Sequence, residues 1–358
     1  MEDRRVAFVG AGAVAHYHAY ALAALKFYYQ HHPAVHCVAV TSATAENREA
    51  FAARYGFEYA LATQDLWRRT DVDTVYILSP NALHYTHLAS ALTMRGVRRI
   101  YIEKPLCTSE AEERGITEEL LRSAEGKSVQ VGFQFLQMSS VRRARLLWQQ
   151  NRFGAPVHFH ASYLHSGYLD QDYRRQRAER LKPTPEGGAL GDLGSHALSL
   201  MTAFLGDGIE VLDAVEGPRF SDVPPDSDLS SIVLCRDRTS GAVGAVTASR
   251  VSCGAGEVLE GEIRCADGGF KFTTERPETL EVFSATAREA SILNCASDFA
   301  PHSQFPHRAC PAGWLRAFVH ANYLFLSGSD GLPAPDLRHG LTVQRLLREA
   351  ACLIAVRD

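Results

Sequence analysis

The sequence predicts an α/β protein with a doubly wound parallel sheet in its N-terminal part and an α+β domain with a mostly antiparallel, open sheet in its C-terminal part. Over about the first 130 residues, short apolar segments alternate with helix-length segments, which is typical of βαβ units. From about residue 155 the apolar segments follow one another with few helices between them, which favours an antiparallel sheet. The length of 358 residues also exceeds one average domain, so we expect domains at 1–130 and 131–358.

The N-terminal segments are ordered as a parallel sheet requires. Their apolar residues are continuous rather than alternating, as expected for strands that are covered on both faces. Strands are expected at 5–9, 35–41, 73–79, 99–103 and 129–133. Helices are expected from the glycine-rich turn to about Tyr29 and at 45–55, 85–95 and 109–123.

The C-terminal part contains more strands than helices. Strands are expected at 157–163, 230–234, 242–251, 257–265 and 269–273. Helices are expected at 187–205, 314–325 and 341–356, and the last of them can pack back on the first domain. Proline and glycine indicate loops at 182–191 and 217–226, and 295–311 is expected to be irregular.

Composition and charge narrow the function classes. There are 37 basic and 41 acidic side chains, a net charge of −4, which argues against nucleic-acid binding. The segment Val6–Leu25 has no charged residue and is long enough to span a bilayer, but it contains glycine, histidine and tyrosine and begins as a strand, so we expect no membrane span. Eight scattered cysteines with no C-x-x-C pair favour free thiols and a cytoplasmic location.

A glycine-rich turn follows the first expected strand. The segment Gly10-Ala11-Gly12-Ala13-Val14-Ala15 has the form G-x-G-x-x-A. In such a turn the first glycine permits a tight bend, and the second lets a pyrophosphate approach the backbone at a helix N-terminus. The sequence therefore predicts dinucleotide binding by Gly10, Gly12, Ala13 and Val14.

The end of the second strand bears on the choice between NAD and NADP. NAD sites usually place an acidic residue there to bind the ribose hydroxyls. Here Ser42 is expected at that position, and no acidic residue occurs before Glu46. The missing carboxylate favours NADP, although no arginine follows directly and Arg48 lies further along the next helix.

Two more motifs follow expected strands, at the sheet edge where a nicotinamide would lie. Ser79-Pro80-Asn81-Ala82-Leu83-His84 ends the third strand, and Glu103-Lys104-Pro105 ends the fourth. The chain has five lysines against 32 arginines, so a lysine that closes an apolar strand is poorly explained as a surface residue. Cofactor contacts are expected from Ser79, Pro80, Asn81, His84, Glu103 and Lys104.

A fourth motif, G-G-x-x-x-D-x-G-x-H, begins at Gly187. If a helix begins near Gly191, Asp192 and His196 lie four residues apart on one face. Glycines within a helix cost about 1 kcal/mol each relative to alanine, so close approach of a ligand is one explanation for them. A capping aspartate and a core histidine are the alternative.

These four motifs, in this order and over nearly the whole chain, resemble those of the Gfo/Idh/MocA family (glucose-fructose oxidoreductase, inositol dehydrogenase and MocA). The resemblance implies an N-terminal Rossmann domain, a C-terminal sheet that forms homodimer or homotetramer contacts, and NAD(P)-dependent chemistry on a secondary alcohol or ketone of a sugar, glycoside or cyclitol. Lys104, Asp192 and His196 match the catalytic trio of the family. His18 matches the histidine that usually follows its glycine-rich loop.

Oxidation of a secondary alcohol requires removal of the hydroxyl proton while a hydride leaves the carbon. His196 is expected as the general base, because an imidazole accepts protons near neutral pH. Asp192 would orient it or pass on the proton, and Lys104 would stabilise negative charge on the substrate oxygen.

Substrate contacts are expected from the strand and loop that carry Tyr163, His165 and Tyr168. Strand alternation places Tyr163 and His165 on one side, where they would face either the substrate or the core. Two other function classes stay open: a non-catalytic dinucleotide-binding sensor, and a hydrolase or epimerase that recycles tightly bound NAD. No metal is expected, because His31, His32 and His36 lack neighbouring ligands at metal-binding spacing.

Overall fold

The computed structural model describes residues 2–181, 187–218, 220–224, 227–295, 312–328 and 330–355. Two compact units account for the described chain. The first contains the described residues of Met1–Gln134 and Leu315–Leu341, and the second contains those of Phe135–Asp298, His307–Trp314 and Thr342–Asp358. The expected loop at 295–311 lies almost wholly outside the described residues.

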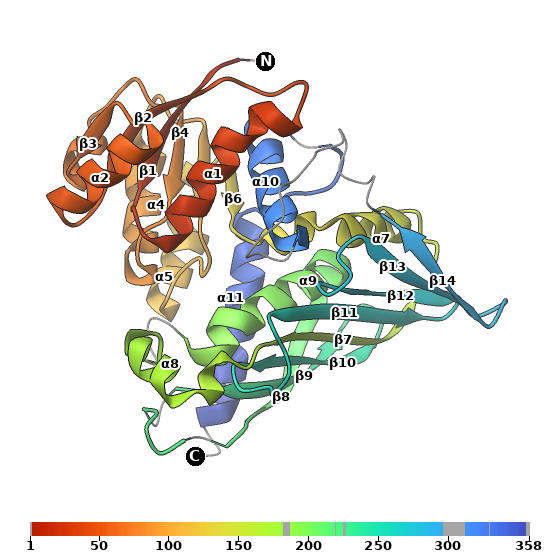
Figure 1. Cartoon of the computed structure of the whole chain (residues 1–358). Helices are drawn as coiled ribbons and strands as arrows, with labels where there is room; N and C mark the ends of the chain where they lie inside the picture. Colours follow the sequence, from red (N-terminus) through yellow and green to blue (C-terminus); the bar gives the residue numbers. More distant parts are fainter. Residues whose placement is uncertain are drawn as a thin grey trace. The chain divides into compact units, whose positions relative to one another are not determined.

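The first unit is built on a six-stranded parallel sheet with the strand order β3-β2-β1-β4-β5-β6, which confirms the expected doubly wound fold (Figure 1). The strand order reverses between β1 and β4, the place where such sheets bind ligands. The strands are β1 (Arg4–Val9), β2 (Val35–Thr41), β3 (Tyr59–Leu61), β4 (Thr74–Ile77), β5 (Arg99–Ile102) and β6 (Ser128–Val131). The edge strand β3 was not expected from the sequence.

Helices connect these strands. They are α1 (Ala13–Tyr28), α2 (Ala45–Tyr55), α3 (Thr63–Leu66), α4 (His84–Thr93), α5 (Glu110–Gly115) and α6 (Leu121–Ser123), and α10 (Ala312–Ser327) belongs to this unit from Leu315 onward. A π-helical turn joins α5 to α6. Phe8 of β1 is fully buried, and its ring centroid lies 5.0 Å from that of Phe57 and 5.1 Å from that of Tyr76, so aromatic side chains anchor the strand to its neighbours.

The second unit has an eight-stranded sheet with the order β14-β13-β12-β11-β7-β10-β9-β8. Its pairs are antiparallel except for β7 with β10, so the expected mostly antiparallel sheet is confirmed. Its strands are β7 (Pro156–Leu164), β8 (Ile209–Glu216), β9 (Ser230–Asp237), β10 (Val243–Ser249), β11 (Val258–Cys265), β12 (Gly268–Thr273), β13 (Thr279–Ser284) and β14 (Glu289–Asn294). Sequence reasoning missed β8, β13 and β14.

One face of this sheet packs against helices. α9 (Ser195–Leu205) contacts β7, β10 and β11, and α7 (Ser139–Gln149) contacts β12 and β13 (Figure 1). Along β9, the buried Val233 and Cys235 alternate with Ile232 and Leu234, which are 43% and 47% exposed, so the opposite face is apolar and exposed at this end of the sheet. Further along the same face, β11 and β12 carry Glu262 and Lys271. The remaining helices are α8 (Gln171–Gln176) and α11 (Leu337–Ala355). Arg345 of α11 donates to the carbonyls of Asp207 and Ile209 in this unit.

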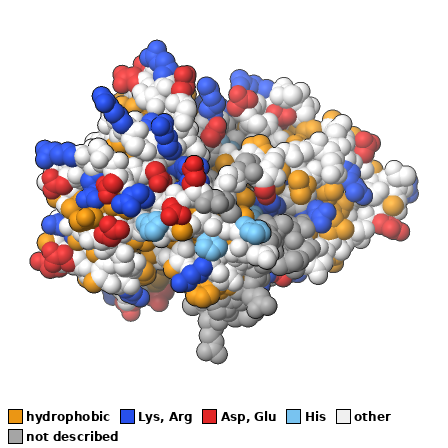
Figure 2. All heavy atoms as spheres, turned by 90° about the horizontal axis from the view of Figure 1, so that it is seen from above, with side chains coloured by type: hydrophobic (Ala, Val, Ile, Leu, Met, Phe, Trp, Pro, Cys, Tyr) orange, Lys and Arg blue, Asp and Glu red, His pale blue; other side chains and the backbone are white. Residues whose placement is uncertain are grey.

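The described residues also bear on four general properties: membrane spans, disulfides, metal sites and surface charge. No described helix is both long and apolar enough to cross a membrane. The seven cysteines in the described chain are free thiols. Nowhere in the described part do three potential ligands from His, Cys, Asp and Glu lie close enough to hold a metal ion, and His36 instead contacts Asp3. On the face drawn in Figure 2, basic and acidic side chains are interspersed.

Candidate active site

The glycine-rich turn joins β1 to α1 and leaves space for a ligand. Gly10 has φ +115°, and a β-carbon there would lie 2.4 Å from the Leu78 carbonyl oxygen, so only glycine fits. A β-carbon at Gly12, the residue before α1, would meet nothing within 4 Å. The first turn of α1 has no acidic residue, and Ala13 and Val14 begin it. Amide donors beside open space suit the pyrophosphate of a dinucleotide.

The end of β2 carries no carboxylate. Ser42 Oγ accepts a hydrogen bond from Asn47 Nδ2 at 2.9 Å, and Asn47 Nδ2 also contacts the carbonyl of Ala11 in the glycine-rich turn. Arg48 Nη1 lies 3.5 Å from the Ser42 carbonyl oxygen. Glu46 is exposed in the first turn of α2. The polar groups beside the turn are therefore a hydroxyl, an amide and a guanidinium.

His84 joins the ends of β4 and β5. Its side chain is buried, with Nε2 2.9 Å from the Ser79 carbonyl oxygen and Nδ1 2.6 Å from the Pro105 carbonyl oxygen. Both contacts are hydrogen bonds only when both ring nitrogens carry hydrogen. Burial lowers the pKa of His84, and the two carbonyl acceptors oppose that shift. Both ring nitrogens of His84 are therefore in contact with backbone carbonyls, one in each of the two loops. The exposed Pro80 and the half-buried Asn81 lie between β4 and the helix that begins at His84.

Glu103 fixes the start of the Lys104 loop. One carboxylate oxygen lies 3.0 Å from Nε2 of the fully buried His18, whose Nδ1 lies 3.1 Å from Asn322 Oδ1 in α10. The other oxygen accepts from the Lys104 backbone N–H at 3.3 Å. Lys104 itself is half-buried, and its bond to Pro105 is cis. The lysine therefore follows β5 on a backbone that is held from both sides.

Asp228 holds the start of the helical segment that carries Asp192 and His196. Its buried carboxylate accepts from the Leu190 N–H at 2.8 Å and from Ser231 Oγ at 2.6 Å, and its carbonyl accepts from the Ala189 N–H. Burial raises the pKa of Asp228. Gly188 has φ +59°, and a β-carbon there would lie 1.6 Å from Asp228 Oδ1. This glycine is therefore explained by the approach of Asp228 and not by a ligand.

Asp192 and His196 lie in consecutive helical turns. Asp192 belongs to the π-helical turn Leu190–Gly194, and His196 lies in the first turn of α9. The Asp192 carboxylate accepts a hydrogen bond from Arg250 Nη2 at 2.8 Å. The buried His196 ring packs edge-to-face against Phe135, at 5.0 Å between centroids, and lies 5.8 Å from the Tyr163 ring.

The expected substrate residues lie in the same cluster of the second unit. Tyr163 donates its hydroxyl hydrogen to Glu257 at 2.8 Å. Burial, followed by the carboxylates of Glu257 and Asp192, raises the pKa of Tyr163. His165 accepts the Gly167 N–H at Nδ1, which leaves Nε2 as the donor of the neutral ring. Burial lowers the pKa of His165; Arg250 adds to this shift and Glu257 opposes it.

Each unit thus brings some of the predicted residues together. In the first, the glycine turn, Ser79 and Lys104 follow β1, β4 and β5, which are adjacent parallel strands, so they lie at one edge of the sheet. In the second, Asp192, His196, Tyr163 and His165 form one cluster. Sequence reasoning missed Arg250, Glu257 and Asp228, which contact this cluster or its helix.

Two family profiles match the chain. Residues 4–135 match a profile described as "Oxidoreductase family, NAD-binding Rossmann fold". Residues 141–271 match the GFO/IDH/MocA C-terminal domain. The chain belongs to the Gfo/Idh/MocA family. This confirms the resemblance that the four sequence motifs indicated.

Several characterised proteins resemble this family member. The levoglucosan dehydrogenase of Pseudarthrobacter phenanthrenivorans is 26% identical over 317 residues, which cover 80% of this chain and 77% of the relative. A dTDP-3,4-didehydro-2,6-dideoxy-alpha-D-glucose 3-reductase of Streptomyces antibioticus is 28% identical over 51% of this chain and 53% of its own length.

Solved structures share the fold. A levoglucosan dehydrogenase in complex with NADH and levoglucosan has a TM-score of 0.84 and 22% identity, and the match covers 100% of this chain and 98% of that one. An inositol dehydrogenase homologue of Azotobacter vinelandii, with NADH and myo-inositol, has a TM-score of 0.80 and 18% identity, with 99% and 96% of the two chains covered.

Proposed function

We propose that this oxidoreductase transfers a hydride between a nicotinamide dinucleotide and a secondary alcohol or ketone of a sugar, glycoside or cyclitol. The observation that carries the proposal is the placement of Lys104. It follows β5 on a backbone held by His84 and Glu103, at the same sheet edge as a glycine turn that fits a pyrophosphate. The levoglucosan and myo-inositol complexes of its structural relatives support this substrate class.

We assign the catalytic roles to Lys104, Asp192 and His196. A nicotinamide dinucleotide bound at the glycine turn would supply the hydride-transfer chemistry. His196 removes the hydroxyl proton, Asp192 orients the proton transfer, and Lys104 donates to the substrate oxygen and favours negative charge on it. Substrate hydroxyls are bound by Tyr163 and His165.

We further propose that the two parts of the chain bind different ligands. Residues 1–130 bind the dinucleotide, through the glycine turn, Ser42 and the Ser79–Asn81 segment, and 131–358 bind the substrate. His84 and Glu103 hold the backbone beside Lys104, because their side chains already contact Ser79, Pro105 and His18.

A substrate screen tests this proposal. The full-length protein is incubated with NAD⁺ or NADP⁺ and a panel of anhydrosugars, glycosides and inositols, and in reverse with keto-sugars and the reduced cofactors. Nicotinamide absorbance near 340 nm reports the reaction. We expect turnover with at least one compound of the panel. Dinucleotide binding without turnover on any compound would favour a sensor, and product formation with no net absorbance change would favour a recycled cofactor.

The two glycines of the turn should respond differently to substitution. Gly10→Ala is expected to destabilise the fold by about 3 kcal/mol, because the backbone is left-handed and the new β-carbon meets the Leu78 carbonyl. Gly12→Ala places its methyl group in open space, so it should leave the melting temperature unchanged and weaken dinucleotide binding. Thermal unfolding and fluorescence titration with reduced cofactor measure the two effects. Unchanged binding by Gly12→Ala would contradict the proposed pyrophosphate site.

We propose that NADP is preferred over NAD. No carboxylate follows β2 directly, and Arg48 lies beside the Ser42 carbonyl. Ser42→Asp should therefore lower the ratio of kcat/KM for NADP over NAD by about tenfold or more, because the new charge repels the 2′-phosphate. Asparagine has nearly the same shape as aspartate but no charge, so Ser42→Asn should keep the wild-type ratio of kcat/KM for NADP over NAD. A wild-type enzyme that uses NAD better than NADP would contradict this preference.

We also propose that the chain forms a homodimer or homotetramer through the open face of its second sheet. Val215 of β8 pairs directly across from Ile232 of β9, and they are 38% and 43% exposed, with Leu234 and Val243 similarly exposed nearby. Contiguous exposed apolar side chains of this kind indicate an interface. Sedimentation equilibrium measures the assembly mass, and a monomer at micromolar concentration would contradict the proposal.

A further inference from the structure

We propose that Arg250 is a positioning residue of the reaction: it fixes the orientation of the Asp192 carboxylate and keeps it ionised. This inference rests on the role proposed for Asp192. The sequence gives no indication of it, because Arg250 lies 58 residues away from Asp192, just after β10.

The guanidinium of Arg250 is fully buried and held on several sides. Nη2 donates to Asp192 Oδ2 at 2.8 Å, and Nη1 donates to the Arg180 carbonyl oxygen at 2.9 Å. The Tyr168 ring lies 4.9 Å from the guanidinium carbon, a cation–π contact. The Arg250 backbone is also fixed, because its N–H donates to the Leu229 carbonyl and its own carbonyl accepts from the Tyr168 N–H. A cation held this way has little freedom to move.

Burial differs between the two partners. The Arg250 side chain is 0% exposed, whereas the Asp192 side chain is 25% exposed. A buried guanidinium needs an anion beside it, and Asp192 supplies that anion. The carboxylate in turn contacts a donor that is held in place, and a quarter of the Asp192 side chain is exposed. This is the arrangement of a catalytic group oriented by a partner behind it.

Other charged and titratable groups surround Asp192. The negative charge of Asp192 helps to raise the pKa of Tyr163 and of Tyr168, and it opposes the lowering of the pKa of His165 by burial. The Glu257 carboxylate acts on His165 in the same direction as Asp192. His196 lies on the next helical turn. Of these neighbours Glu257 is a second carboxylate, and like charges favour protonation of one another. Arg250 is a cation in direct contact with the Asp192 carboxylate, so its removal should favour the protonated form of Asp192.

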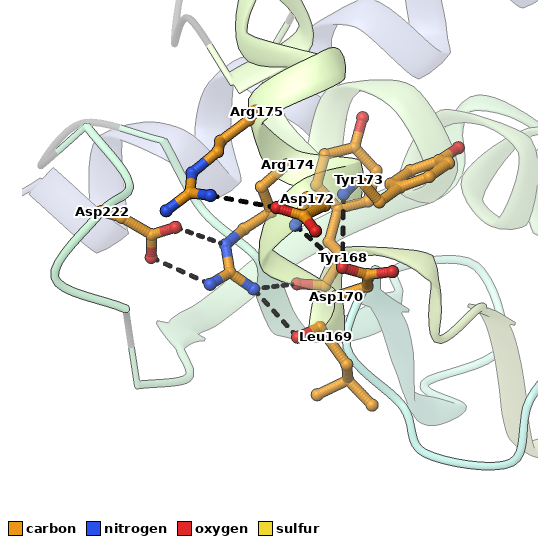
Figure 3. Close-up of polar contacts among 8 residues, drawn as sticks. All are labelled: Tyr168, Leu169, Asp170, Asp172, Tyr173, Arg174, Arg175 and Asp222. Carbon is orange, nitrogen blue, oxygen red and sulfur yellow. Dashed lines mark hydrogen bonds and ion pairs between the residues drawn. The ribbon is translucent and has the colours of Figure 1, made fainter.

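A second arginine, Arg174, holds the segment that carries Tyr168 (Figure 3). Arg174 of α8 donates through Nε and Nη2 to Asp222 at 2.9 and 3.0 Å, and through Nη1 to the carbonyls of Tyr168 and Leu169. Tyr168 packs in a small core with Leu181, Val223 and Leu229. The ring that stacks on Arg250 is thus fixed from behind, and the contacts run from Asp222 through Arg174, Tyr168 and Arg250 to Asp192.

The test compares Arg250→Met with Arg250→Lys, which keeps the charge, and with Arg175→Met, an exposed arginine of α8 as the matched control. On a substrate identified by the screen, Arg250→Met should lose about tenfold or more in kcat/KM near neutral pH. The acidic limb of its pH profile should move up by about 1–3 pH units, since an adjacent cation shifts a carboxyl by that amount. Arg250→Lys should keep most of the wild-type kcat/KM and most of the wild-type position of the acidic limb. Arg175→Met should match wild type in both. Where Arg250→Met does not fold, Arg250→Gln replaces it.

A measurement without substrate separates this inference from the proposed function. In ligand-free protein labelled with ¹³C at aspartate carboxyls, the resonance that Asp192→Asn removes should titrate at higher pH in Arg250→Met. An unchanged titration and an unchanged pH profile would overturn the role of Arg250, and so would a loss that is uniform in pH and not rescued by lysine. Full activity of Asp192→Asn would instead overturn the role proposed for Asp192.

Discussion

Replacement of Lys104 by alanine is expected to lower turnover by about 10²–10³, equivalent to about 3–4 kcal/mol in the barrier. The loss follows from the role proposed for the ammonium group, which donates to the substrate oxygen as negative charge develops on it. The fold should be unaffected, because Glu103 and His84 hold this loop through the backbone at Lys104 and Pro105, which the substitution leaves in place. Steady-state kinetics with saturating cofactor measures the effect.

Two further measurements make the Lys104 result specific. Lys26→Ala removes an exposed lysine at the end of α1 and should keep wild-type turnover. Fluorescence titration with reduced cofactor should give nearly the same affinity for Lys104→Ala as for wild type. Turnover of Lys104→Ala within about threefold of wild type would refute the assignment.

Replacement of His196 by asparagine is expected to lower kcat by about 10²–10⁴, the usual contribution of a positioned general base. Asparagine keeps a polar side chain of similar reach beside Phe135 and Tyr163 but does not accept a proton near neutral pH. The activity that remains should rise with pH, since hydroxide then takes over the removal of the alcohol proton. Rates from pH 6 to 10 measure both effects.

The matched control for His196 is His158→Asn. His158 is an exposed histidine of β7, the strand that carries Tyr163, and its replacement should leave kcat unchanged. If His196→Asn lost activity only in proportion to a lowered melting temperature, His196 would be a core residue and another group would have to serve as the base.

Sequence reasoning found strands that bury almost every side chain, such as β1 and β4, and strands in which buried and exposed side chains alternate, such as β9. It missed β3, which has three residues at a sheet edge, and β14, whose residues are almost all exposed. An edge strand that buries little of its surface leaves no hydrophobic period to detect. Backbone pairing with β2 and β13 forms these two strands, and pairing is not visible in local sequence.

In the candidate site, too, some residues could be recognised from the sequence and others could not. The glycine turn and Lys104 are recognisable because each follows a strong apolar strand, and strand ends are where such sheets bind ligands. Arg250 and Asp228 are not recognisable, because the residues that they hold, Asp192 and Leu190, lie 58 and 38 positions away in the sequence. The close approach of Asp228 also explains why residue 188 is a glycine, which the sequence alone did not suggest.

Deuterium transfer tests the central claim most directly. The protein is incubated with oxidised cofactor and a substrate from the screen deuterated at each carbinol carbon, and the cofactor is recovered for mass spectrometry and NMR. We predict one deuterium at C4 of the nicotinamide for each substrate molecule oxidised. Substrate conversion with no deuterium in the recovered cofactor, or with the label returned to the product, would contradict the proposed dehydrogenase.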